Sequence, residues 1–410
     1  MKTNLFAILC FAFLCISCNK TSTTLDSIEV IDISNLDGLS SSEEMTNLFS
    51  DIKYVALETN DDVLVSSNPN IAVTDSFIFL SEIEQPLYMF DRFTGKFIRK
   101  IGHIGTDPEG YAKDTWGYIT FNIDDKMNRI YFLGWDNDLM VYDFQGNYLS
   151  KVKIENREQY SLASSFFLVD SLHIYGYEKL HVQSNMPPLY VIDANTGETK
   201  DIRGLYAEQI PIDEVVNSSM TLGNYIAYGG HFSFMDFQGN KVFYYTIGSP
   251  SLWEIDGKVR IKPDYNDTIY TISNDTIKAS YILNLGNRSW PYHERITTKD
   301  YANERIAINY IFENKDCIYI HFCTDLYANT YSGSEETFVA FYDKRNKTNC
   351  VIKGDNYLDT ANNQEFRIRG LSSDGYFYTL LSADKLSDNL KEIMQVDDDS
   401  NPVVGFFVNK

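Results

Sequence analysis

One short pattern recurs along the chain and limits the folds that it can adopt. An Asp or Asn, one further residue and then a run of apolar, strand-favouring residues occur together six times. The copies are "DSFIFL", "NRIYFL", "DSLHIY", "NKVFYY", "DCIYIH" and "DGYFYT", which begin at Asp75, Asn128, Asp170, Asn240, Asp316 and Asp374. Each copy predicts a tight turn that leads into a strand. Such repetition is typical of folds that are built from one repeated unit.

The repeated unit contains more than this one strand. A second apolar run follows the first three copies and ends at Asp91, Asp143 and Asp193, and a short Gly-containing turn and a further strand come next. Six units of four antiparallel strands predict an all-β fold, a six-bladed β-propeller over residues 27–410. The 29 Tyr and 26 Phe residues agree with a core made of strands.

The last unit ends after its third strand, "PVVGFFV", so the ring needs a strand from elsewhere. An open ring would expose a strand edge, and we expect an N-terminal strand from residues 27–34 or 52–59 to close it. Residues 40–49 have the pattern of a capping box and predict a short helix. Leu386, Leu390, Ile393 and Met394 recur at helical spacing and predict an amphipathic helix that ends before the acidic run 397–399.

The N-terminus has the pattern of a targeting signal. Lys2 precedes an apolar stretch, residues 5–16, that is too short to span a bilayer. Ser17 and Cys18 follow, so residues 1–17 resemble a bacterial lipoprotein signal peptide, in which Cys18 is the lipidated residue. A secretory signal cleaved nearby is the alternative. Either signal predicts a location outside the cytoplasm.

The lipoprotein interpretation makes residues 18–26 a polar tether and the lipid the only membrane attachment. We expect the protein in the cell envelope, at the outer membrane. Residues 19–24, "NKTSTT", lack an acidic run, which favours the periplasmic side over the cell surface. The net charge of −22 would repel phosphate backbones, so nucleic acid is not an expected partner.

Three cysteines, Cys317, Cys323 and Cys350, lie beyond the signal. The first two are six residues apart on one predicted strand and cannot pair with each other. Structural thiols, or one disulfide from Cys350 to either of the others, remain open. The Cys-x-x-Cys spacing of zinc sites is missing, and no metal or cofactor is expected.

The strand order of a blade separates two kinds of connection. Connections between first and second strands, and between third and fourth, are short here and lie on one face. Connections between second and third strands, and between blades, are long and lie on the other face, where binding residues usually gather. We assign all four tryptophans to the long loops, with Tyr292 and His293 beside one of them. The candidate ligand-binding residues are Trp116, Trp135, Trp253, Trp290, Tyr292 and His293. Each tryptophan could equally be a packing residue.

Catalytic signatures are weak. No sialidase box, Gly-x-Ser-x-Gly or His-x-x-x-His pattern is present, and the six histidines are scattered. Asp136, Asn137 and Asp138 have the chemistry of calcium ligands, but their spacing alone does not make them converge. No catalytic residue is assigned.

Several segments carry a resemblance to a known family. "YVALET", "FDRFTGKFIRKIGHIGTDPEGY", "YNDTIYTI" and the closing "SNPVVGFFVNK" resemble the six-bladed β-propeller lipoproteins of Bacteroidetes, which are similar to NHL-repeat and TolB-like propellers. The resemblance covers nearly the whole mature chain. It implies a cell-envelope setting, often beside polysaccharide-uptake systems, and no established reaction.

These observations favour a lipid-anchored, non-enzymatic binding or scaffold protein for a glycan or an envelope protein. A carbohydrate-active propeller enzyme, a hydrolase or lyase, is the alternative. A purely structural partner in an envelope assembly is the third hypothesis. The sequence names no ligand.

Overall fold

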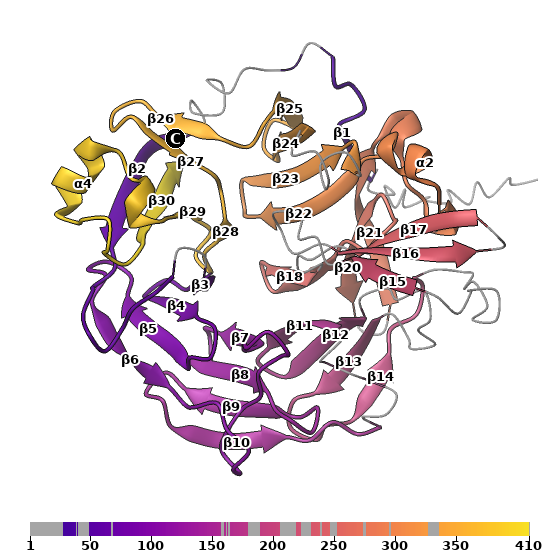
Figure 1. Ribbon diagram of the computed structural model, residues 1–410. Coiled ribbons are helices and arrows are strands. Elements are labelled where there is room, and N and C mark those ends of the chain that lie inside the picture. Colours follow the sequence, from indigo (N-terminus) through magenta and orange to yellow (C-terminus); the bar gives the residue numbers. More distant parts are fainter. Residues whose placement is uncertain are drawn as a thin grey trace, which may run out of the picture.

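Figure 1 shows six sheets arranged around a central axis in the computed structural model. The structure describes residues 28–37, 39, 49–66, 69–156, 160, 162, 165–178, 189–205, 219–222, 231–237, 240–246, 252–273, 276–294, 297–326 and 336–409. The predicted signal peptide, Cys18, the predicted tether and nearly all of the predicted helix at residues 40–49 lie outside these ranges. The predicted all-β, six-bladed propeller of four-stranded antiparallel blades is confirmed.

Blades 1 to 3 follow the chain, with the first strand of each innermost. Their strands are β3 (Asn70–Val73), β4 (Phe77–Ser81), β5 (Leu87–Asp91) and β6 (Phe97–Ile101); β7 (Phe121–Asp124), β8 (Arg129–Leu133), β9 (Leu139–Asp143) and β10 (Tyr148–Val152); β11 (Ser165–Asp170), β12 (His173–Glu178), β13 (Leu189–Asp193) and β14 (Thr199–Asp201).

Blades 4 to 6 complete the ring, and the outermost strand of blade 6 comes from the N-terminal part of the chain. Their strands are β18 (Leu252–Ile255), β19 (Lys258–Ile261), β20 (Thr268–Ser273) and β21 (Thr276–Asn284); β22 (Ala307–Glu313), β23 (Cys317–Thr324), β24 (Glu336–Asp343) and β25 (Thr348–Lys353); β28 (Gly370–Leu371), β29 (Phe377–Leu381), β30 (Val403–Asn409) and β2 (Phe49–Ala56).

Most of the middle strands are buried on both faces because each blade packs between two others. All eight residues of β23 are buried, for example, although strand side chains alternate between the two faces of a sheet. One apolar cluster joins β23 to blade 4 through Ile269 and Leu283, and another joins it to blade 6 through Phe377 and Phe407. Continuous apolar runs therefore suit this fold better than strict alternation does.

The N-terminal closure of the ring is confirmed, and the second of the two expected segments supplies it. β2 pairs antiparallel with β30, with Ile52 opposite Phe407 and Tyr54 opposite Gly405. The side chain of Phe407 is fully buried, and its ring lies 4.9 Å from that of Phe49 and 4.8 Å from that of Phe366. This aromatic cluster fixes the N-terminal strand to the C-terminal one.

The other expected segment has a different role. β1 (Glu29–Asp32) pairs in parallel with β21 and adds a fifth strand to the outer edge of blade 4. Lys347 of blade 5 forms an ion pair with Glu29 at 2.6 Å, and Asn349 donates a hydrogen bond to the carbonyl of Asp32. β1 thus also contacts blade 5.

One of the six sequence copies was assigned to the wrong strand. The copy at Asn240 forms β17 (Asn240–Thr246), which belongs to a separate sheet with β15 (Ser219–Leu222) and β16 (His231–Phe237). Figure 1 draws this sheet at the outer rim, beside blade 4. The second strand of blade 4 is β19, which follows a turn at Asp256 and Gly257. The Lys and Arg in β19, "KVRI", hid its strand pattern, whereas "VFYY" is strongly apolar.

The remaining elements are short and lie outside the blades. The expected amphipathic helix is present as α4 (Asp388–Met394), whose N-cap, Ser387, accepts a hydrogen bond from the backbone N–H of Leu390. Leu390 and Met394 pack on blade 6, but Ile393 is exposed, and the acidic run follows the helix in solvent. The others are β26 (Tyr357–Asp359), β27 (Gln364–Phe366), α2 (Lys299–Asn303), η2 (Gly286–Arg288), η3 (Tyr292–Glu294) and η4 (Ala383–Lys385).

Two faces of the disc are named from here on. The short-turn face carries the turns between first and second strands and between third and fourth strands. The long-loop face carries the connections between second and third strands and between blades. No helix among the described residues is long and apolar enough to cross a bilayer.

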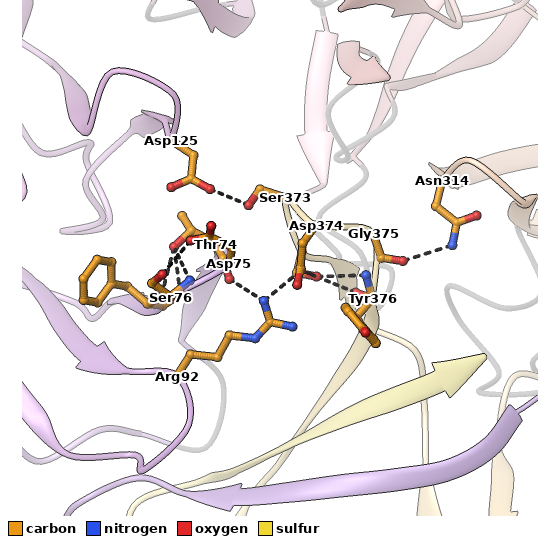
Figure 2. Close-up of polar contacts among 12 residues, drawn as sticks. Thr74, Asp75, Ser76, Arg92, Asp125, Asn314, Ser373, Asp374, Gly375 and Tyr376 are labelled. Atoms are coloured by element: carbon orange, nitrogen blue, oxygen red, sulfur yellow. Dashed lines mark hydrogen bonds and ion pairs between the residues drawn. The ribbon is translucent and has the colours of Figure 1, made fainter. Parts of the chain in front are cut away.

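Arg92 of blade 1 joins the closing blade to the ring on the short-turn face. Its guanidinium donates to the carbonyl of Thr74 at 2.7 Å and to the carboxylate of Asp374 at 2.8 Å (Figure 2). The same group lies 4.6 Å from the ring centre of Phe406, so its flat face is covered by an aromatic side chain. A buried cation is thus satisfied by both blades.

The turn between β28 and β29 also contacts other blades. Ser373 donates its hydroxyl to Asp125 of blade 2 at 2.6 Å, and Asn314 of blade 5 donates to the carbonyl of Gly375 at 3.0 Å (Figure 2). The closing blade is therefore held by three other blades at this face.

Truncating Phe407 should destabilise the protein strongly. Phe407→Ala leaves a cavity between the N- and C-terminal strands, and we expect the free energy of unfolding to fall by about 3–5 kcal/mol. Urea denaturation followed by intrinsic fluorescence measures it. Leu149→Ala, at a half-exposed position of β10, should change the same quantity by less than about 0.5 kcal/mol. Equal effects of both substitutions would contradict the assigned closure.

Removing the carboxylate beside Arg92 tests the contact between blades 1 and 6. Asp374→Ala leaves a guanidinium group that is only 6% exposed without its counter-charge. Because the side chain of Asp374 is 32% exposed, water can partly replace it, and we expect a loss of about 1–3 kcal/mol in stability. The matched control is Asp316→Ala in the corresponding turn of blade 5. Its partner, Arg345, is 3.7 Å away and exposed, so the loss should stay below about 0.5 kcal/mol.

Candidate functional site

A channel of about 2270 Å³ runs along the axis of the propeller. Residues of the innermost strands of all six blades, β3, β7, β11, β18, β22 and β28, line it. The lining continues into first-to-second turns at one end and into blade-to-blade loops at the other. The channel therefore extends from one face of the disc to the other, and different residues line its two ends.

Side chains from non-neighbouring blades meet across the short-turn end. Lys126 of blade 2 forms an ion pair with Glu254 of blade 4, although blade 3 lies between them. The Ser373–Asp125 hydrogen bond likewise joins blade 6 to blade 2 past blade 1. These contacts place polar side chains across this end of the channel.

A buried carboxylate organises the wall between blades 4 and 5. Glu313, which is 1% exposed, accepts a hydrogen bond from Nε1 of Trp253 at 2.7 Å and one from Nζ of Lys344 at 2.6 Å. Nε of Arg260 lies 3.4 Å from the same carboxylate. Two cations offset the burial of this charge, so the cluster is a contact between blades.

The placement of Trp253 was wrong in the sequence analysis. It was expected between the second and third strands, on the long-loop face, but it lies in β18, the first strand of blade 4, and lines the channel wall. The segment around Trp253 forms β18 and β19, the inner hairpin of blade 4. Assignment of the copy at Asn240 to the second strand of this blade placed the true hairpin in the loop that follows that copy.

Trp116 stands at the long-loop end of the channel. It lies in the loop between blades 1 and 2, as expected, is 67% exposed and belongs to the channel lining. The carboxylate of Asp114 accepts hydrogen bonds from the backbone N–H groups of Trp116 and Tyr118, which fixes this loop. The backbone of Glu84 in blade 1 donates to the carbonyl of Gly117 at 2.9 Å. A well-supported loop thus presents an exposed indole ring beside the channel.

The other two tryptophans share this face but do not line the channel. Trp135 is half-exposed between β8 and β9 and donates Nε1 to the carbonyl of Gly105 at 2.6 Å. Trp290 is 4% exposed, packs edge-on against Tyr265 and donates to the carbonyl of Glu294. Trp290 is therefore a packing residue in this loop.

Tyr292 and His293 follow Trp290 in η3. The side chain of His293 is 72% exposed, with Nε2 3.8 Å from the carboxylate of Glu294. Neither residue belongs to the channel lining, so the six predicted binding residues do not form one site. Of the six candidate residues, Trp116 and Trp253 line the channel.

The candidate calcium ligands do not converge. Asn137 uses its amide on the backbone of Tyr160 and Leu162, and Asp138 is buried in an ion pair with Lys151 at 3.0 Å. Asp136 is exposed. Among the described residues, no group of three or more His, Cys, Asp or Glu side chains is arranged to hold a metal ion.

None of Cys317, Cys323 and Cys350 is in a disulfide. Cys317 and Cys323 lie on β23 and Cys350 lies on β25, so β24 separates them and no disulfide can form. Burial raises the pKa of the Cys317 thiol to about 12, which keeps it protonated and a poor nucleophile at neutral pH.

Sequence reasoning missed one buried polar cluster. His321, fully buried, has Nε2 3.3 Å from the carboxylate of Asp355 and Nδ1 3.0 Å from the amide of Asn309. Its ring stacks on Tyr310, which separates it from the channel. A substrate in the channel would meet the tyrosine first, so this pair is not placed for catalysis.

A search of solved structures found matches to β-propellers. A "Putative exported protein (BF0058)" from Bacteroides fragilis has a TM-score of 0.58 at 14% sequence identity, over 93% of this chain and 99% of that one. The β-propeller domain of Cps50 (Swd1) from Myceliophteria thermophila reaches 0.39 at 8% identity, over 85% and 98% of the chains. The WD40 domain of Neurospora crassa Pan2 reaches 0.39 at 12% identity, over 84% and 89%. At 14% identity, the match to the Bacteroides fragilis protein shows a shared fold alone.

A search of curated protein sequences found no match. The family of the domain of unknown function DUF4934 matches residues 28–408, which include all of the propeller strands except the last residue of β30, Asn409. The chain therefore belongs to the DUF4934 family.

Proposed function

We propose that the mature protein is a lipid-anchored protein of the cell envelope that binds a glycan without catalysing a reaction. The ligand would bind at the long-loop end of the central channel. The observation that carries the proposal is the exposed ring of Trp116 on the rim of a wide channel. An exposed indole ring can cover the apolar face of a sugar.

The surroundings of Trp116 suit a polar ligand. Asn70, Asp114, Thr120 and Arg369 line the same channel and can bond to hydroxyl groups. Sites that combine an aromatic surface with a few polar groups are the usual form of small-ligand pockets. The side chains across the short-turn end favour approach from the long-loop end.

An envelope protein is the second candidate ligand. Leu64, Ile83 and Trp135 are exposed on the long-loop face together with Trp116. Exposed apolar and aromatic side chains of this kind are enriched at the centres of protein interfaces. A partner protein would use these residues in addition to the channel rim.

The envelope location rests on the N-terminal sequence. The signal-like residues 1–17 precede Cys18, and the structural match from Bacteroides fragilis carries the description of an exported protein. Cys18 would carry the acyl chains, and more than one chain makes such an anchor stable.

Trp116→Ala should weaken glycan binding. In native affinity gels that contain single polysaccharides, residues 19–410 should be retarded by the matching glycan. Loss of the indole surface should weaken that retardation about tenfold or more in apparent Kd, the effect of a residue at the centre of an interface. Trp135→Ala, on the same face but outside the channel, is the matched control and should bind normally.

Three other results of this experiment would change the assignment. Release of reducing sugar by the unmodified protein would favour the enzyme alternative. Equal loss of binding in both variants would place the site on the open face instead of the channel rim. If no polysaccharide retards the protein, the protein-partner candidate gains support, and capture of envelope proteins by residues 19–410 follows.

Cys18→Ala should abolish lipidation. Cells that express the full chain and grow with a labelled fatty acid should give a labelled, membrane-bound product, and the variant should give an unlabelled one. Cys350→Ala, at a cysteine inside the propeller, should keep the label. A labelled Cys18→Ala product would contradict the proposed anchor site.

A further inference from the structure

We propose that the short-turn face of the propeller is turned toward the lipid bilayer and rests on it. The long-loop end of the channel would then open away from the membrane. The inference rests on the proposed anchor at Cys18 and adds an orientation and a second contact surface to it. The contact partner is the headgroup region of a membrane.

The direction of β1 supports this orientation. β21 begins at the β20–β21 turn on the short-turn face and ends at a blade-to-blade loop on the long-loop face. β1 runs parallel to it, from Glu29 opposite Tyr281 to Asp32 opposite Asn284. The N-terminal end of β1 is therefore the end that faces the short-turn side.

The side chain of Glu29 confirms the polarity of the strand. Its carboxylate lies 2.6 Å from Nζ of Lys347, in the β24–β25 turn of the short-turn face, and accepts the hydroxyl of Tyr342 at 2.8 Å. At the other end, the backbone of Ile33 donates to the carbonyl of Asn284, the last residue of β21. The hydrogen bond from Lys347 lowers the pKa of Glu29, which keeps this ion pair formed at neutral pH.

The length of the tether permits this orientation. Nine residues lie between Cys18 and Ile28, and the ten steps from one to the other can span at most about 35 Å. Glu29 pairs with Tyr281, so about 17 Å of β21, from Thr276 to Tyr281, separates this level from the short-turn end of the strand. The tether is therefore long enough to pass the short-turn face.

Four apolar side chains project from the short-turn face. Phe93 is 72% exposed, Leu172 58%, Met127 46% and Tyr376 39%. They lie in or beside the short turns of blades 1, 3, 2 and 6, whereas β1 lies at blades 4 and 5. β1 and the apolar side chains thus lie on opposite sides of the ring. Side chains of this kind insert into the interface between headgroups and acyl chains.

The net charge limits which lipids this face can contact. With a charge of −22, the protein is repelled by an anionic surface. The contact should therefore form on zwitterionic lipids and depend on apolar insertion.

Fluorescence quenching by lipids tests the orientation directly. Residues 19–410 with an N-terminal hexahistidine tag would be held on phosphatidylcholine vesicles by a nickel-chelating lipid. The vesicles would contain phosphatidylcholine brominated on its acyl chains, which quenches tryptophan near the membrane. The emission added by Phe93→Trp or Leu172→Trp should fall by more than about half, since inserted side chains lie about 5–10 Å into the interface.

The matched control is Leu64→Trp on the long-loop face, where Leu64 is 64% exposed. Its added emission, and that of the native Trp116 and Trp135, should be unchanged. Quenching of Leu64→Trp, or the absence of quenching in both short-turn variants, would overturn the proposal.

A second variant separates insertion from mere proximity. In a Met127→Trp protein, Phe93→Ser together with Leu172→Ser should remove most of the quenching. Unchanged quenching would contradict insertion through these side chains. Both serines replace exposed residues, so the fold should persist, which circular dichroism checks.

The artificial anchor keeps this test independent of lipidation in the cell. If the Cys18→Ala protein still carries the fatty-acid label but Phe93→Trp and Leu172→Trp are quenched, the proposed anchor site is wrong and the proposed contact surface is supported. If Cys18 is lipidated but Leu64→Trp is quenched, the proposed anchor site is supported and the proposed orientation is wrong.

Discussion

The structure depends on the burial of both faces of most middle strands. A four-stranded blade with apolar side chains on both faces has no stable form in water by itself, because both faces would be exposed. Six blades around an axis solve this, provided that the ring is closed. The pairing of β2 with β30, and the aromatic cluster around Phe407, supply that closure.

The repeated turn could be read from the sequence because its chemistry is local. An Asp precedes the second strand and another follows the third, and each stabilises its turn through hydrogen bonds to nearby backbone groups. The carboxylate of Asp91, for example, accepts hydrogen bonds from the backbone N–H groups of Phe93 and Thr94. The copy at Asn240 failed because a local signal also arises in a sheet outside the ring. The true second strand of blade 4, β19, is short and contains charged residues, so its sequence lacks an apolar run. Its Arg260 forms an ion pair with Glu313, a contact that the sequence does not reveal.

The candidate site was less predictable because it depends on contacts between distant segments. Trp116 and Trp290 look alike in sequence, each in a long blade-to-blade loop. One is held at the channel rim by a neighbouring turn, and the other is covered by Tyr265. Likewise, Asp355 is 34 residues from His321, and nothing local marks the two as partners. Which polar residues face the channel follows from the way the blades pack together.

The closing blade also has a consequence for biosynthesis. β2 is among the first strands to be made and its partner, β30, is the last, about 350 residues later. Until β30 is made, blade 6 lacks the strand between β2 and β29. During this time β2 has unpaired backbone groups, which can pair with the wrong strand or with another chain. A protein that crosses a membrane in an extended form before folding would release both strands into the same compartment at nearly the same time. Export before folding would therefore shorten the period during which β2 waits without its partner.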